Sequence, residues 1–148
     1  MKIAMVGPAH PFKGGITHYT TLLFQKLKVA HEVRYYAFAR NYPRWLFPGK
    51  IGGQSDALFE LNGEALRVLD AFKPWTWGKT AGAIRDFDPD VLILPWWVSF
   101  WAPLLYTLAR KTRGGRMKIV FVCHNVLPHE KFPLQKSIAR KVLSLADE

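Results

Sequence analysis

Short apolar runs that suit buried strands alternate with longer segments of helical pattern along this chain of 148 residues. The clearest apolar run is 117–123, and shorter ones lie at 2–6 and 91–94. Strands this uniformly apolar are typical of parallel sheets, in which helices cover both faces. The sequence therefore predicts an α/β fold, a Rossmann-like parallel sheet with helices on both faces.

The other elements follow from hydrophobic period and from turn residues. We expect one more strand at 31–38 and helices at 16–28, 74–87, 101–111 and 133–146. Residues 65–71 fit a helix and a strand equally well, and 39–63 read as a long loop with one short element near 57–61. In the first helix the apolar side chains fall near one face, which favours that face as the buried one; they are Ile16, Tyr19, Leu22, Leu23 and Leu27.

An uncharged stretch of 19 residues, 91–109, has the length of a membrane span and is followed by basic residues. Two observations favour another interpretation. Pro95 and Pro103 interrupt the stretch, and its composition changes midway from β-forming to helix-forming residues. A strand, a turn and a helix account for the stretch with fewer exceptions.

The net charge of +10, from 21 Lys and Arg against 11 Asp and Glu, favours an anionic partner. Nucleic acid, a phosphorylated ligand and an acidic membrane surface all fit, and so does a merely solubilising surface. The one cysteine, Cys123, permits neither a disulfide within the chain nor a Cys-based zinc site. Because Gly7, Pro8 and His10 break the apolar start, a signal peptide is not expected, and we expect a cytoplasmic protein.

Ligands of open α/β sheets bind at the carboxyl ends of the strands, here the loops 7–15, 95–100 and 124–132. In the first loop, Gly14 and Gly15 stand directly before a helix, where free N–H groups could hold a phosphate. The spacing is neither Gly-x-Gly-x-x-Gly nor that of a Walker loop, and a Gly-Gly pair also suits a simple turn.

The last of these loops carries His124 and Asn125, then His129 and Glu130. A histidine at the end of a central strand is well placed to contact a ligand, although a structural hydrogen bond is an equally ordinary role. The spacing matches no common zinc arrangement, so no metal site is expected. In the middle loop, Trp96 and its aromatic neighbours offer stacking platforms for a sugar or else belong to the core.

Three stretches together resemble the amino-terminal domain of glycosyltransferase family 4, which has the two-domain GT-B architecture. They are Met-Lys-Ile-Ala-Met-Val-Gly-Pro-Ala-His-Pro-Phe-Lys-Gly-Gly-Ile at the start, Pro-Asp-Val-Leu-Ile-Leu-Pro-Trp-Trp from residue 89, and Val-Cys-His-Asn-Val-Leu-Pro-His-Glu from residue 122. The resemblance covers essentially the whole chain, and it does not identify the sugar.

The resemblance implies roles for particular residues. His124 is the expected catalytic residue, at the cleft beside the donor sugar, and Asn125 takes the second position of that pair. Gly14 and Gly15 match the glycine loop that approaches the donor diphosphate or the acceptor. The other expected donor-binding or acceptor-binding residues are His10, Lys13 and Trp96.

The resemblance also implies a reaction. A hexosyl group would pass from a nucleoside-diphosphate sugar to a glycan or lipid-linked acceptor with retention of configuration, without a metal or other cofactor. The carboxyl-terminal domain, which should hold the nucleotide, is missing from residues 1–148, so the chain alone should be inactive. Cell-envelope glycan synthesis by a peripheral membrane protein would fit this chemistry.

The alternative is a basic membrane-surface or ligand-binding Rossmann module without catalysis. Basic residues mix with aromatic ones in two places, which suits an anionic membrane surface; the residues are Arg40, Arg44, Trp45, Phe47 and Lys50, and Lys73, Trp75, Trp77 and Lys79. Nucleic acid is not an expected partner, because no RRM, KH, helix-turn-helix or zinc pattern is present.

Overall fold

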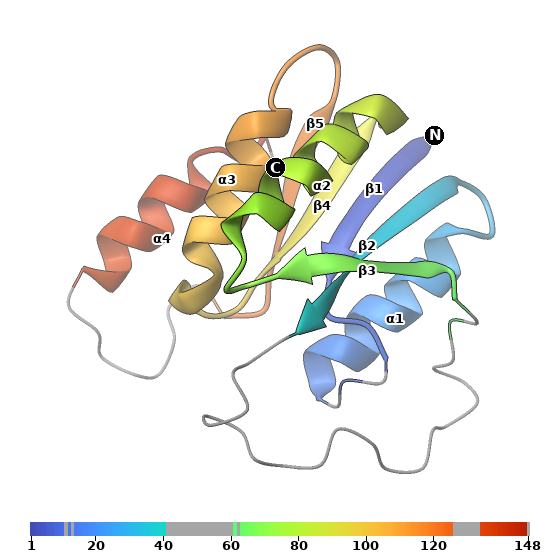
Figure 1. The fold of residues 1–148 in the computed structure, drawn as a ribbon, viewed down its shortest axis with the longest axis horizontal. Helices are drawn as coiled ribbons and strands as arrows, with labels where there is room; N and C mark the ends of the chain where they lie inside the picture. The colour runs from blue at the N-terminus through green and yellow to red at the C-terminus, as the bar shows by residue number, and fades with distance from the viewer. Residues whose placement is uncertain (11, 13, 41–60, 62, 126–133, 148) are drawn as a thin grey trace.

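Five parallel strands form one sheet in the order β3-β2-β1-β4-β5 (Figure 1). The computed structural model describes residues 1–10, 12, 14–40, 61, 63–125 and 134–147. The strands are β1 (Lys2–Gly7), β2 (Glu32–Arg40), β3 (Ala65–Asp70), β4 (Val91–Trp96) and β5 (Lys118–Cys123). The predicted Rossmann-like α/β fold is confirmed, and the ambiguous stretch 65–71 is a strand.

In the described part of the chain, four α-helices connect or follow the strands: α1 (Gly15–Leu27), α2 (Pro74–Phe87), α3 (Ala102–Thr112) and α4 (Gln135–Leu143). A 3-10 turn, η2 (Ser99–Trp101), leads into α3. Pro74 opens α2, where its missing N–H costs nothing and its fixed φ suits the helix. Each expected helix is present within a few residues of its expected bounds, while most of 39–63, with the short element expected near 57–61, lies outside the described residues.

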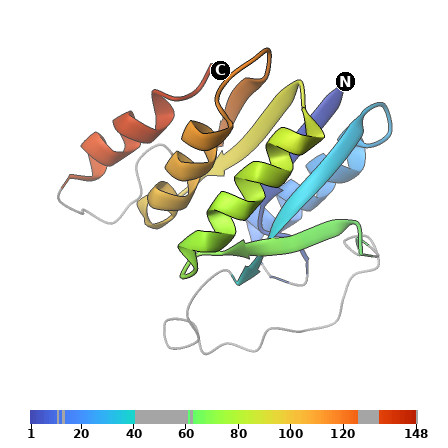
Figure 2. The ribbon, with the colours of Figure 1, turned by 45° about the horizontal axis from the view of Figure 1, so that its top comes forward.

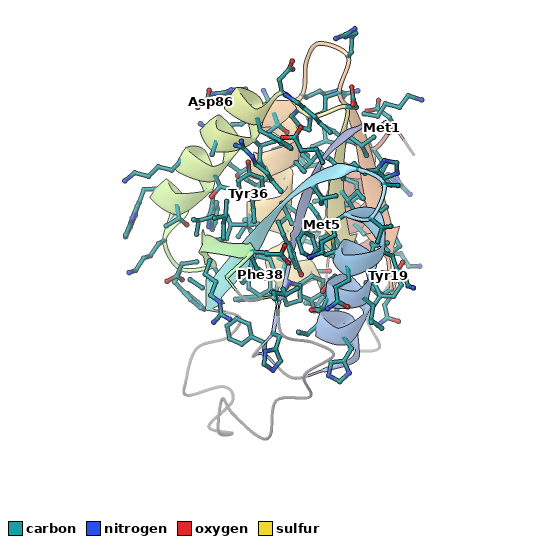
Figure 3. All side chains as sticks on the ribbon, turned by 90° about the vertical axis from the view of Figure 1, so that its right-hand side faces the viewer. Met1, Met5, Tyr19, Tyr36, Phe38 and Asp86 are labelled. Atoms are coloured by element: carbon teal, nitrogen blue, oxygen red, sulfur yellow. The ribbon has the colours of Figure 1, made fainter. Side chains whose placement is uncertain are left out.

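The helices cover both faces of the sheet, three on one side and α1 on the other (Figure 2). Successive side chains of β1 alternate between the two cores: Ala4 and Val6 pack with α2, α3 and α4, and Met5 packs with α1. Figure 3 shows the same division, with Tyr36 toward α2 and Met5 toward α1.

The face of α1 that packs on the sheet is not the one its apolar pattern predicts. Its buried residues are Thr17, Thr20, Thr21 and Phe24. Tyr19 and Leu22, expected inside, are each 45% exposed. The threonines are small, and the Thr20 hydroxyl is satisfied within the structure, because it lies 2.7 Å from the Pro8 carbonyl oxygen and 2.8 Å from that of Ile16. The outer side of α1 is therefore partly apolar.

Strand β4 runs two residues further than expected, through Pro95 to Trp96. Pro95 lacks an N–H, but the pairing of β4 with β1 ends at Ile93, so that side of the strand no longer needs a donor there. Pairing with β5 continues to the end of the strand. The longer strand draws Trp96 into the core.

Two aspartates make the same pair of backbone contacts at strand edges. The Asp90 N–H donates to the Lys2 carbonyl at one end of β1, and the Lys2 N–H donates to the Asp90 carboxylate, both at 2.8 Å. Asp147 makes the matching pair with Ile119, again at 2.8 Å. At the outer edge of β5, the Ile119 N–H therefore has the Asp147 carboxylate as its acceptor, and the Ile119 carbonyl has the Asp147 N–H as its donor.

The uncharged stretch 91–109 forms β4, η2 and the first part of α3. Among the helices of the described residues, none has the length and apolar character needed to cross a membrane. The strand–turn–helix interpretation of this stretch is confirmed.

Truncation of Phe38 should test the core beneath α2 and α3. Its ring is fully buried and stacks on Trp101 at 4.5 Å between ring centroids, so Phe38→Ala should lower the free energy of unfolding by about 3–5 kcal/mol. Urea unfolding followed by circular dichroism measures the change. Leu22→Ala, on the exposed side of α1, is the control and should cost less than about 0.5 kcal/mol. Equal costs for the two variants would contradict this packing.

Candidate functional site

The end of β5 and the beginning of α1 meet at the carboxyl edge of the sheet. His124 directly follows β5, and its ring meets the ring of Tyr19 edge-on, with centroids 4.9 Å apart and planes at 86°. Tyr19 lies four residues, or about one helical turn, after Gly15. Figure 3 shows Tyr19 on the outer side of α1. The structure therefore brings His124 into contact with α1, about one helical turn from the Gly14–Gly15 turn, although more than a hundred residues separate them.

Two buried hydroxyl groups hold the loop that leads to this turn. Tyr35 donates to the Pro8 carbonyl oxygen at 2.6 Å, and Thr20 approaches the same oxygen at 2.7 Å. Burial raises the pKa of Tyr35, so its hydroxyl remains a donor. A third contact, from Arg67 of β3 to the His10 carbonyl oxygen at 2.6 Å, holds the next part of the loop. The loop is thus fixed to α1, β2 and β3.

The same loop passes close to α1 at Gly7. A Cβ atom at this position would lie 3.3 Å from Thr20 Cγ2, tighter than most real contacts. Glycine therefore permits the close approach of the first strand's end to the helix.

Gly14 and Gly15, where α1 begins, face open space. Gly14 has a φ of 134°, which favours glycine, and a Cβ at Gly14 or Gly15 would meet no atom within 4 Å. The first backbone hydrogen bond of the helix runs from His18 to Gly14, so the N–H groups of residues 15–17 have no partner within the helix. The first turn contains no acidic residue. These groups and the helix dipole suit an anion such as a phosphate.

His124 combines a fixed backbone with an imidazole that carries little charge. Its N–H donates to the Trp96 carbonyl oxygen at 2.9 Å and so extends the pairing of β5 with β4. Burial lowers the pKa of the imidazole below its ordinary value of 6.5, so the ring is neutral at pH 7. Within the described part of the chain, Nε2 is buried without a hydrogen-bond partner. A neutral imidazole can donate from one ring nitrogen and accept at the other.

The other expected site residues differ in how exposed they are. Asn125 is exposed and follows His124 at the same edge, and His10 is half-buried in the anchored loop. Lys13 lies outside the described residues. Trp96 is fully buried in the core with residues of α2, α3 and α4, which is the second of the two roles that the sequence left open for this loop.

Tyr19 is the site residue that the sequence did not indicate. Its apolar ring fits the helical period of α1, so the pattern assigned it to the core. The one signal that could have found it is its position four residues after Gly15, on the turn that follows the glycine pair. Across residues 1–10, 12, 14–40, 61, 63–125 and 134–147, no group of three or more His, Cys, Asp or Glu could hold a metal ion.

Comparison with known proteins identifies no relative of this chain: no protein-family profile, curated sequence or solved structure matches it significantly. The fold therefore defines the class, a Rossmann-like α/β domain, and the function must be argued from the residues at the carboxyl edge.

Removal of the Tyr35 hydroxyl should loosen the first loop. Tyr35→Phe should lower the free energy of unfolding by about 1 kcal/mol, because a buried hydrogen bond to Pro8 is lost. The amide resonances of Gly14 and Gly15 should shift as well. Tyr36→Phe is the matched control, since it loses a hydroxyl that bonds to Ala83 on the other face. Glycine shifts of equal size in both variants would contradict the anchoring role.

Titration of His124 should report its desolvation. In the folded chain, the ring resonances of His124 followed over a pH series should give a titration midpoint below 6.5, the ordinary pKa of histidine. In the chain unfolded by urea, the midpoint should lie near 6.5. Because the unfolded chain then binds the proton more readily, stability should fall as the pH drops below 6.5. His124→Gln should reduce that fall. A folded-state midpoint at or above 6.5 would contradict the burial of this ring.

Proposed function

We propose that this chain is the amino-terminal domain of a retaining GT-B glycosyltransferase of the family 4 type. It transfers a hexosyl group from a nucleoside-diphosphate sugar to a glycan or lipid-linked acceptor. The observation that carries the proposal is the contact of His124 with Tyr19, one helical turn from the Gly14–Gly15 turn. The start of α1, which suits an anion, and the neutral imidazole of His124 thereby lie at the same edge of the sheet.

Each part of this edge has a task in sugar transfer. The leaving diphosphate gains negative charge as the glycosidic bond breaks, and preorganised N–H groups stabilise that charge best. The N–H groups at the start of α1 that have no partner within the helix supply such donors. Because Nε2 of His124 is buried, Nδ1 is the nitrogen that donates a hydrogen bond to a hydroxyl group of the sugar, and Asn125 is available beside it. The net charge of +10 attracts the anionic donor over a longer range.

The exposure of this edge fits a site that a second domain completes. Gly14, Gly15 and Asn125 are all exposed, so a donor bound here would remain open to water on one side. Transfer to an acceptor rather than to water requires closure around the donor. The proposal therefore includes a facing nucleotide-binding domain, and the chain alone binds donor weakly and transfers no sugar.

Nuclear magnetic resonance with a panel of uridine, guanosine and adenosine diphosphate sugars tests the proposal. One donor class should shift the amides of Gly14, Gly15 and His124, while the amide of Asp90 at the opposite edge stays unchanged. His124→Ala should weaken binding by about tenfold, as expected for loss of one hydrogen bond to a polar ligand. His31→Ala, which removes a histidine just before β2 at the opposite edge, should bind as the unchanged chain does.

Two results would overturn the proposal. One is the absence of shifts at the carboxyl edge with every donor class. The other is equal binding of a free nucleoside diphosphate and its sugar conjugate in both the unchanged chain and His124→Ala, which would favour a nucleotide-binding module without transfer.

A further inference from the structure

Exposed aromatic side chains gather where β3 passes into α2 and where η2 leads into α3. Phe72 is 45% exposed, Trp75 is 62% exposed and Phe100 is 48% exposed. The rings of Phe72 and Phe100 contact each other, with centroids 5.9 Å apart. Figures 1 and 2 show the beginnings of α2 and α3 side by side. We call these three residues the aromatic patch.

The patch rests on side chains that are held in the core. Phe100 meets the buried ring of Trp101 edge-on at 5.3 Å. Trp77, which follows Trp75 by two residues, is only partly exposed, and its indole N–H donates to the Asp70 carbonyl oxygen at 2.8 Å. Trp77 therefore braces the start of α2, while Trp75 points away from the core. The exposed rings are supported from beneath.

Two exposed lysines lie beside the aromatic patch, on a helix layer that is rich in basic residues. Lys73 directly precedes α2 and Lys79 lies one turn after Trp75, and both are exposed. The three helices on this side of the sheet carry seven basic residues and one acidic residue, Asp86. The basic residues are Lys79, Arg85, Arg110, Lys111, Lys136, Arg140 and Lys141. This helix layer is thus strongly electropositive.

We propose that the aromatic patch and the lysines beside it bind the surface of an anionic phospholipid bilayer. Tryptophan and phenylalanine favour the boundary between headgroups and acyl chains, and lysines at that depth contact anionic headgroups. The inference goes beyond sugar transfer and does not depend on it. In a transferase it would place the carboxyl edge close to a lipid-linked acceptor.

Other occupants fit this surface less well. A second copy of the chain would bring two strongly positive helix layers together, which their repulsion opposes. Single-stranded nucleic acid stacks its bases on separate aromatic faces. Here Phe72 and Phe100 instead pack against each other at 49° and form one apolar ridge. A ridge flanked by lysines matches a planar interface better than a strand of bases.

Vesicle co-sedimentation tests the proposal with the whole chain. Binding should be weak to phosphatidylcholine vesicles and much stronger when about 30% of the lipid is phosphatidylglycerol. Lys73→Gln and Lys79→Gln should each weaken binding to the anionic vesicles about fivefold. Trp75→Ala should weaken it about tenfold through the loss of inserted apolar surface. Leu22→Ala removes an apolar side chain that is 45% exposed on the opposite face, and this variant should bind as the unchanged chain does.

Quenching distinguishes insertion from simple charge attraction. Phosphatidylglycerol vesicles with brominated acyl chains should quench part of the tryptophan fluorescence, and Trp75→Phe should lose most of this quenching while it still sediments with vesicles. Circular dichroism checks that each variant folds.

Three results would overturn the proposal: binding that ignores anionic lipid, equal binding by Trp75→Ala and the unchanged chain, or displacement from vesicles by random single-stranded DNA whose own binding needs Trp75. The last would assign the aromatic patch to nucleic acid. None of these results bears on the binding of sugar nucleotides at the carboxyl edge, so either proposal can be overturned while the other stands.

Discussion

The carbonyl oxygen of Pro8 accepts hydrogen bonds from two buried hydroxyl groups, those of Tyr35 in β2 and Thr20 in α1. A carbonyl left unpaired at this depth would cost on the order of 1–3 kcal/mol, so the loop has one favourable position. That position fixes how closely α1 approaches β1 at Gly7 and where the Gly14–Gly15 turn opens. The position of the first N–H groups of α1, and with it the proposed phosphate site, depends on these two contacts.

The orientation of α1 follows from the same contacts and has a consequence for the site. Because Thr20 must face the Pro8 carbonyl, the threonine side of the helix packs on the sheet. Tyr19 then lies on the outer side, where it meets His124 at the end of β5. Had the apolar side of the helix faced inward, Tyr19 would have entered the core and this contact would not exist.

The helix layer on one face of the sheet is positively charged. The layer of α2, α3 and α4 carries nearly all of its ionisable side chains as cations and adds exposed aromatic rings at one end. The proposed donor site lies at the carboxyl edge of the same sheet, where α2 and α3 also begin. One orientation on an anionic surface would therefore keep both features close to lipid.

Sequence periodicity alone determined the described helices, the strands other than β3 and the parallel α/β class, because these depend on residues close together in the chain. It left 65–71 undecided between helix and strand. It also placed His124 and the glycine pair at strand ends. Only the tertiary structure decided the buried side of α1, the burial of Trp96 and the meeting of Tyr19 with His124. Each of these depends on hydrogen bonds or packing between distant segments, for which a single sequence contains no local signal.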